Sequence, residues 1–340
     1  MFIHEPSYYN FSLYLSMDIV NYVKSNYPIP TIGFEHPISS RIIRLSGVDS
    51  ASDFTRKSLL NLDLSPFQGV LTDSGNLNSI RSLGPLHNFS ENQSEGIHLV
   101  ISRREHDAHI VDSVASDRDV MAFIDKDSRK YGHLMSHKGH RRIIGSQSHC
   151  VQFKNSEDHS IDHLRLSDIR ADIQKAEVNL RTVETAIINL DVLRLSDNLG
   201  SAGSMTTGLS IEELCHLSKY IGASTHLKQV ILTGYDHKSD QFGMMSTNMA
   251  LVIWYVLKGN AIRINEMEED EIKANTYTIV PDDFDAELTF IENPVSGRWW
   301  IKVPSEFDEN GATIACTKQD YDDACQNIIS DRIMEAFTKL

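Results

Sequence analysis

The chain alternates between short apolar runs and longer segments with helical spacing of apolar residues. The short runs have the length and β-branched content of buried strands. They fall at 30–34, 67–71, 98–101, 120–124, 142–144, 163–166, 186–191 and 229–233. Helical spacing marks 168–184, 210–220 and 243–257. Strand and helix in alternation predict an α/β protein with a mostly parallel sheet of eight strands and helices on its faces.

Two of the three predicted helices carry a further signal. Ser210 followed by Glu213 is a capping-box pattern, which marks the start of the helix at 210–220. The segment 243–257 is apolar on almost every side, so we expect a buried helix there.

After residue 260 the pattern changes. Acidic, solvated stretches at 267–271 and 281–287 alternate with two short strand-like runs, 276–280 and 299–303, before a final helix expected at 319–337. We therefore expect one α/β domain, residues 1–260, with a C-terminal appendage, residues 261–340, packed on the same domain.

Composition narrows the classes of partner. The chain has 32 Lys and Arg against 47 Asp and Glu, a net charge of −15, which disfavours binding to nucleic acid or to an anionic membrane surface. Since no run of eighteen apolar residues occurs and the first twenty residues lack a basic leader, we expect neither membrane insertion nor a secretory signal. Four cysteines without a CxxC pair predict free thiols in the cytoplasm.

Candidate chemistry lies where the predicted strands end. Ligands of open parallel sheets bind outside the carboxyl ends of the strands. The segments that follow four of the strands are acidic or contain His: 102–109, 125–129, 191–197 and 234–240. Their convergence would suit a metal or a polar ligand. The loop GSAGS at 200–204 lacks the Gly-Lys-Ser/Thr of a phosphate loop, so we expect a flexible loop over the sheet edge.

From about residue 95 onward the chain resembles the arginase/ureohydrolase superfamily. The resemblance rests on LDV at 190–192, GLSIEEL at 208–214, VILTGYDH at 230–237 and MALVIWYVLKG at 249–259. GRWW at 297–300 and the ending from Cys316 resemble a formimidoylglutamase-like subgroup of Bacteroidetes-type bacteria. This resemblance implies a three-layer α/β/α fold with an eight-stranded sheet. In active members, two manganese ions bridge a hydroxide that attacks an amidine or guanidine carbon.

The resemblance also implies where metal ligands would lie. The His of the family's Gly-Gly-Asp-His segment falls on Glu105, with His106 next to it. The Asp-Ala-His-x-Asp motif falls on DKDSR, so that Asp125 is kept and Asp127 replaces the His. The first carboxylate of Asp-x-Asp falls on Asp191. These five residues are the candidate metal ligands.

Three positions depart from the family pattern and would block the site. Arg129 stands where the last Asp of the first motif belongs, Leu193 replaces the second carboxylate of Asp-x-Asp, and Gly234 lies at or near the substrate-holding Glu. A guanidinium stays charged and cannot coordinate a metal, and it could neutralise Asp125 or Asp191 instead. We therefore expect a former dimetal cleft rebuilt around internal salt bridges.

These residues leave three functions open. The first is a non-catalytic binding or scaffold protein without a cofactor, whose partner is another protein or a second copy of the chain, met through the acidic C-terminal region or Trp299 and Trp300. The second is a manganese-dependent hydrolase of linear amidine or guanidine C–N bonds. The third is an anion-binding cleft that uses Arg103, Arg104 and Arg129.

Overall fold

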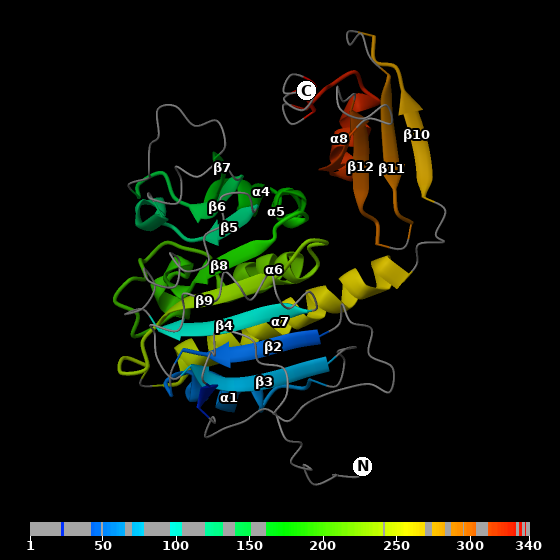
Figure 1. Ribbon diagram of the computed structural model, residues 1–340. Helices are drawn as coiled ribbons and strands as arrows, with labels where there is room; N and C mark the ends of the chain where they lie inside the picture. The colour runs from blue at the N-terminus through cyan, green and yellow to red at the C-terminus, as the bar shows by residue number, and fades with distance from the viewer. Residues whose placement is uncertain are drawn as a thin grey trace.

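The computed structural model describes residues 22–23, 42–48, 50–64, 70–77, 96–103, 120–131, 140–150, 161–240, 242–268, 274–282, 287–294, 296–303, 312–330, 333–334 and 337. Within these residues a nine-stranded sheet forms the centre of the molecule (Figure 1). Eight of its strands are parallel, and the two-residue edge strand β1 runs antiparallel to β3. The expected α/β fold with eight parallel strands is confirmed.

The strands follow the order β1-β3-β2-β4-β9-β8-β5-β6-β7 across the sheet. They are β1 (Tyr22–Val23), β2 (Ile42–Gly47), β3 (Val70–Leu77), β4 (Ile97–Arg103), β5 (Met121–Ile124), β6 (Arg141–Ser146), β7 (Ile161–Arg165), β8 (Thr185–Asn189) and β9 (Gln229–Tyr235). Because β5, β8 and β9 are parallel and adjacent through β8, the residues at their carboxyl ends meet at one edge.

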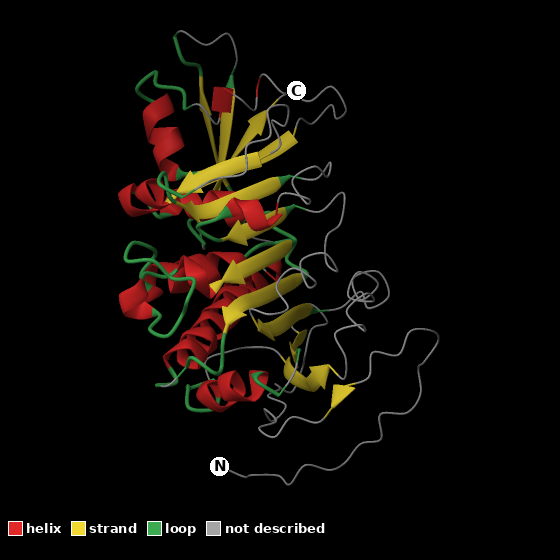
Figure 2. Ribbon diagram, turned by 90° about the vertical axis from the view of Figure 1, so that its left-hand side faces the viewer, coloured by secondary structure: helices red, strands yellow, loops and turns green. Residues whose placement is uncertain are grey.

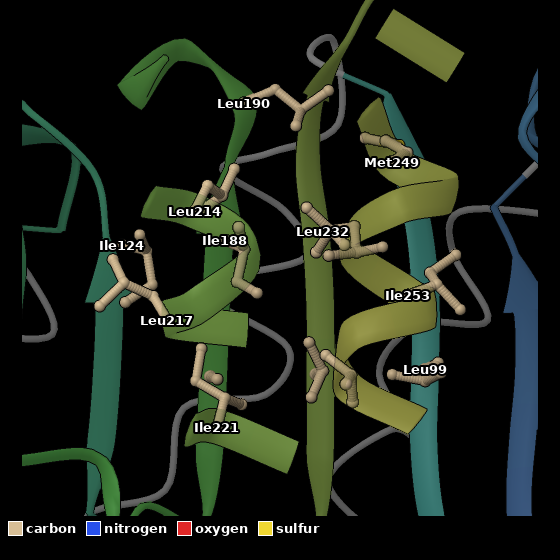
Figure 3. Close-up of a cluster of buried hydrophobic side chains, with 14 of the residues drawn as sticks. Leu99, Ile124, Ile188, Leu190, Leu214, Leu217, Ile221, Leu232, Met249 and Ile253 are labelled. Carbon is tan, nitrogen blue, oxygen red and sulfur yellow. The ribbon is translucent and has the colours of Figure 1, made fainter. Parts of the chain in front are cut away.

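Among the described residues, helices cover one face of this sheet and bury a large apolar cluster against it (Figure 2). They are α1 (Ser52–Leu59), α4 (Leu166–Ala171), α5 (Gln174–Leu180), α6 (Ile211–Gly222) and α7 (Met244–Glu268). Leu232 of β9 lies beside Met249 and Ile253 of α7 in this core (Figure 3). Burial of such side chains contributes about 1.5–3 kcal/mol each.

Two glycines let α6 and α7 pack closely. A Cβ on Gly222 would lie 2.0 Å from the carbonyl oxygen of Val256, and one on Gly259 would lie 2.0 Å from that of Lys219. Only residues without a side chain allow this backbone approach. The helix predicted at 243–257 is thus confirmed and extends to Glu268, across residue 260.

A buried arginine joins α1 to β3. Arg56 is fully buried and binds Asp73 through two hydrogen bonds, Nε to Oδ2 at 2.8 Å and Nη2 to Oδ1 at 2.9 Å. Its other contacts are Asp53, Asn76 and the carbonyl oxygen of Gly75. This network fixes the start of α1 against the carboxyl end of β3.

Several predicted elements need correction. The single helix expected at 168–184 is two helices, α4 and α5, because Asp172 adopts extended backbone between them and its Oδ1 accepts from the amide of Gln174. Strand β2 carries Arg44 and Ser46 among its apolar residues and was not predicted. The run at 30–34 lies outside the described residues.

The C-terminal appendage is a four-stranded antiparallel sheet beyond the end of α7 (Figure 1). Its elements are β10 (Asn275–Ile279), β11 (Leu288–Glu292), β12 (Trp299–Val303), β13 (Ala312–Cys316) and α8 (Lys318–Ala324). Strands β11 and β13 were not predicted. The helix expected at 319–337 is wrong in its length, because α8 ends at Ala324 and Asn327 adopts a positive φ of 61°.

Charged residues hold the appendage against the α/β domain. Glu177 of α5 accepts from Arg181 at 2.5 Å and from Arg298 at 3.0 Å. Arg181 also lies 4.8 Å from the centroid of the Trp300 ring. Trp299 stacks on Tyr277 inside the appendage, so this tryptophan is part of a core.

The four cysteines are free thiols, as expected. In the part of the chain that the structure describes, no helix combines the length and apolar character needed to cross a membrane.

Candidate functional site

Two buried polar residues meet at the carboxyl ends of β5 and β8. Asp125 follows β5 and is fully buried, and its Oδ2 accepts hydrogen bonds from the Tyr131 hydroxyl at 2.7 Å and from Nδ2 of Asn189 at 2.8 Å. Its Oδ1 accepts from the amide of Asp127 at 3.2 Å. A buried carboxylate needs such donors to offset its lost hydration.

Asn189 also binds Asp191, and so it links Asp125 to Asp191. Its Oδ1 accepts from the amide of Asp191 at 3.0 Å, at the start of the short helix η5 (Leu190–Val192). Gly234 of β9 faces it with a φ of +79°, and a Cβ on Gly234 would lie 2.2 Å from Oδ1 of Asn189. The lack of a side chain at Gly234 therefore leaves the space that Asn189 occupies. Sequence reasoning missed Asn189, although it directly precedes the recognised LDV segment.

The loop at 200–204 contacts the carboxylate of Asp191. Ser201 is buried and donates to Oδ1 of Asp191 at 2.7 Å, while its Oγ accepts from the amides of Gly203 and Ser204 at 3.2 Å. The Lys126 ammonium donates to the carbonyl oxygen of Gly203. The loop expected at 200–204 is present, and its polar groups bind residues at the strand ends.

Arg129 points outward and pairs with Asp127. Its Nε and Nη2 donate to the two carboxylate oxygens of Asp127 at 2.9 and 2.6 Å, and its side chain is 57% exposed. Asp127 raises the pKa of Arg129 through these hydrogen bonds. The expected neutralisation of Asp125 or Asp191 by Arg129 is not observed. An exposed pair of this kind contributes little to stability, because water screens the two charges.

Leu193 is part of the apolar core. It is fully buried, and its amide donates to the carbonyl oxygen of Leu190 at 3.1 Å. The position where the resemblance places the second carboxylate of Asp-x-Asp thus holds a buried aliphatic side chain. Glu105, His106 and Arg104 lie outside the described residues.

Comparison with solved structures connects this arrangement to a known fold. Formimidoylglutamase from Bacillus subtilis superposes with a TM-score of 0.54 and 14% identity over 67% of this chain and 89% of its own. The chain has the arginase-superfamily fold. Formiminoglutamase from Trypanosoma cruzi, solved with Mn²⁺, gives a TM-score of 0.54 and 12% identity over 66% of this chain and 94% of its own.

A third arginase-superfamily structure gives the same result. Agmatine ureohydrolase from Thermoplasma volcanium superposes with a TM-score of 0.51 and 12% identity over 68% of this chain and 92% of its own. No protein-family model matches the sequence, and a search of curated proteins finds no match. At these identities the likeness shows the arginase-superfamily fold and nothing finer about activity.

The described residues do not fit the dimanganese centre of an arginase-superfamily enzyme. Among them, no group of three or more His, Cys, Asp or Glu side chains is arranged to hold a metal ion. A cation at Asp125 would have to displace the donors Tyr131 and Asn189, and Lys126 places an ammonium directly beside it in the chain. A divalent ion needs several oxygen or nitrogen lone pairs at one point, and these donors offer protons instead.

Proposed function

We propose that this chain is a non-catalytic relative of the ureohydrolases that acts in the cytoplasm as a binding or scaffold protein. The observation that carries the proposal is the hydrogen-bonded state of Asp125, whose carboxylate accepts from Tyr131 and Asn189 in a fully buried position. A carboxylate used in this way stabilises the fold. Hydrogen bonds to charged groups contribute about 1.5–3 kcal/mol each.

The second strand-end carboxylate supports the same proposal. Asp191 accepts from Ser201 and lies beneath a loop that Lys126 also holds. In an enzyme of this fold the strand ends must stay open to water and substrate, because metal-bound hydroxide is the nucleophile. The contacts of Ser201 and Lys126, which bring residues 201–203 onto the strand ends, support the proposal.

Elemental analysis tests the proposal directly. The full-length protein is purified in the presence of manganese, desalted and measured for metal per chain, with Asp125→Asn as the variant that keeps the shape of the side chain. We expect less than one tenth of a manganese ion per chain in both proteins. Two tightly bound ions per chain in the unaltered protein, lost in Asp125→Asn, would overturn the proposal.

The alternative function is the manganese-dependent hydrolysis of linear amidine or guanidine C–N bonds. One observation favours it: Arg129 lies on the surface and does not fill the strand-end space. Assays with formimidoylglutamate, agmatine and arginine separate the two functions. We expect the unaltered protein to release no more formamide or urea than the Asp191→Asn variant does. Turnover that is lost when Asp125 or Asp191 is replaced would establish the hydrolase.

The proposed partner is another protein or a second copy of the chain. The net charge of −15 favours a basic partner surface over nucleic acid. Trp299 is packed inside the appendage. We therefore expect the partner to contact the appendage through its exposed strand β10 and the residues around that strand. Sedimentation at several protein concentrations would show self-association if the partner is a second copy of the chain. A monomer at all concentrations would mean that the partner is a different protein.

A further inference from the structure

The four-stranded sheet of the appendage has two edges, β13 and β10. The β13 edge lies against the α/β domain, because Nη2 of Arg181 at the end of α5 donates to the carbonyl oxygen of Cys316 at 3.4 Å. Strand β10 is the opposite edge, and within the described part of the chain it pairs only with β11 (Figure 1). A strand in this position presents backbone N–H and C=O groups that a further strand can bind.

Strand β10 lacks the features that protect edge strands from such pairing. Natural edges carry charged side chains, proline or a bulge. The sequence of β10, Asn-Thr-Tyr-Thr-Ile, has no charge and no proline, and its register with β11 is continuous from Asn275 to Ile279. Asn275, Thr276 and Thr278 are exposed, and Thr and Tyr favour the strand conformation. This edge can therefore accept another strand.

Carboxylates stand at both ends of β10. Glu292 of β11 is the register partner of Asn275 and accepts a hydrogen bond from its Nδ2 at 3.1 Å. At the other end, Asp282 follows β10 and Glu287 precedes β11, and both are exposed. The side chains that donate here, Asn275 to Glu292 and Asn327 to Asp282, are neutral amides, which do not cancel a negative charge.

These charges decide between a second copy of the chain and a different protein. Two copies of β10 in an antiparallel pair would bring Glu292 of one copy near Asp282 and Glu287 of the other, where like charges repel. A parallel pair would bring the same carboxylates together. A neutral strand with Lys or Arg on both sides would instead place opposite charges at both ends. The charges therefore favour a different protein as the partner.

We propose that β10 binds an extended segment of another protein, in which Lys or Arg residues flank a neutral stretch that adds a strand to the appendage sheet. In this mode of recognition, backbone hydrogen bonds supply affinity. The flanking cations select the segment through the carboxylates at the strand ends. The inference rests on the proposed function, because it names the chemistry of the partner that a binding or scaffold protein would take.

Hydrogen exchange with a designed peptide tests this site. The probe is Lys-Lys-Val-Thr-Val-Thr-Val-Lys-Lys, added to the full-length protein. We expect exchange at alternate amides of β10 to slow by about tenfold or more, because every second N–H of the edge strand faces the added strand. The absence of this protection at a peptide concentration of about 1 mM would overturn the proposal.

Two control peptides separate backbone pairing from general attraction of lysine to an acidic protein. The first is N-methylated at every Val and Thr, so that it keeps the side chains and charges but loses the amide donors. The second carries Glu in place of each Lys. We expect neither peptide to protect β10. Equal protection by either peptide, or protection confined to residues outside β10, would also overturn the proposal.

Charge variants test the selection of basic segments. Asp282→Asn combined with Glu287→Gln removes two exposed carboxylates beside β10. Asp162→Asn combined with Glu212→Gln removes two exposed carboxylates from the α/β domain and is the matched control. At low salt we expect the first double variant to bind the lysine peptide at least about threefold more weakly than the control does. Equal affinities of the two double variants would contradict the proposal.

The outcome for β10 is distinguishable from the outcome for the proposed function. Bound manganese and turnover together with peptide protection of β10 would refute the scaffold function and keep the strand site. A chain without manganese whose β10 amides gain no protection would refute the strand site alone.

Discussion

Asn189 at the end of β8 donates a 2.8 Å hydrogen bond to the buried carboxylate of Asp125 at the end of β5. The two residues come from the adjacent parallel strands β5 and β8. Asn189 also caps η5, so one amide side chain holds both Asp125 and the backbone of Asp191. This double contact links the carboxyl ends of β5 and β8.

Removal of the Asn189 amide should destabilise the protein. Asn189→Ala leaves the buried Asp125 with one donor fewer, and we expect a loss of about 2–3 kcal/mol in the free energy of unfolding. Asn275→Ala, at an exposed position of β10, is the control and should cost less than about 0.5 kcal/mol. Equal urea midpoints for the two variants would contradict this role for Asn189.

Gly234 and Gly297 form a matched pair of positive-φ glycines. Gly234→Ala meets both an unfavourable φ of +79° and a Cβ placed 2.2 Å from Asn189, whereas Gly297→Ala at +69° meets no atom within 4 Å. We expect about 1–2 kcal/mol of destabilisation for Gly297→Ala and at least about 2 kcal/mol more for Gly234→Ala. Thermal unfolding of both variants measures the difference, which would vanish if Asn189 could move aside freely.

The two arginine pairs, Arg56 with Asp73 and Arg129 with Asp127, should differ greatly in their contribution to stability. Arg56→Ala leaves Asp73 buried and without its bidentate partner, at a cost of about 3–5 kcal/mol. Arg129→Ala breaks a pair whose guanidinium is mostly exposed, so we expect no measurable shift of the denaturation midpoint. Chemical denaturation of the two variants provides the comparison; a large loss for Arg129→Ala would mean that this side chain supports the strand ends after all.

His98 should make the protein less stable in acid. Burial, with a smaller effect of the Arg44 cation, lowers the pKa of His98 from 6.5 to about 4. The unfolded chain therefore binds a proton at His98 between pH 6.5 and 4 while the folded chain does not, so this contribution to stability falls as the pH drops through that range. The loss amounts to about 3 kcal/mol. His98→Gln should flatten the unfolding free energy over this pH range relative to the unaltered protein, and an unchanged slope would exclude His98 as the cause.

Local patterns in the sequence were sufficient for most elements of the main sheet. The capping box at Ser210 and Glu213 forms as expected, with Oγ of Ser210 accepting from the amide of Glu213 at 3.2 Å. Such signals act within one turn of helix, so they need no knowledge of the rest of the chain. The strands β2, β11 and β13 were missed because their polar positions hide the alternation, and only pairing with neighbouring strands makes them strands.

The sequence alone determined which chemical groups stand at the strand ends, including Asp125, Asp191, Arg129 and Leu193. Tertiary structure decided what each group does, because their partners are remote in sequence. Asn189 reaches Asp125 across 64 residues, and Lys126 reaches Gly203 across 77. Arg129 instead binds Asp127, two residues away, on the surface of the molecule. The spacing of residues along the sequence could identify the polar side chains at the strand ends. Only the folded structure could show which of their carboxylates accept hydrogen bonds from other residues of the chain.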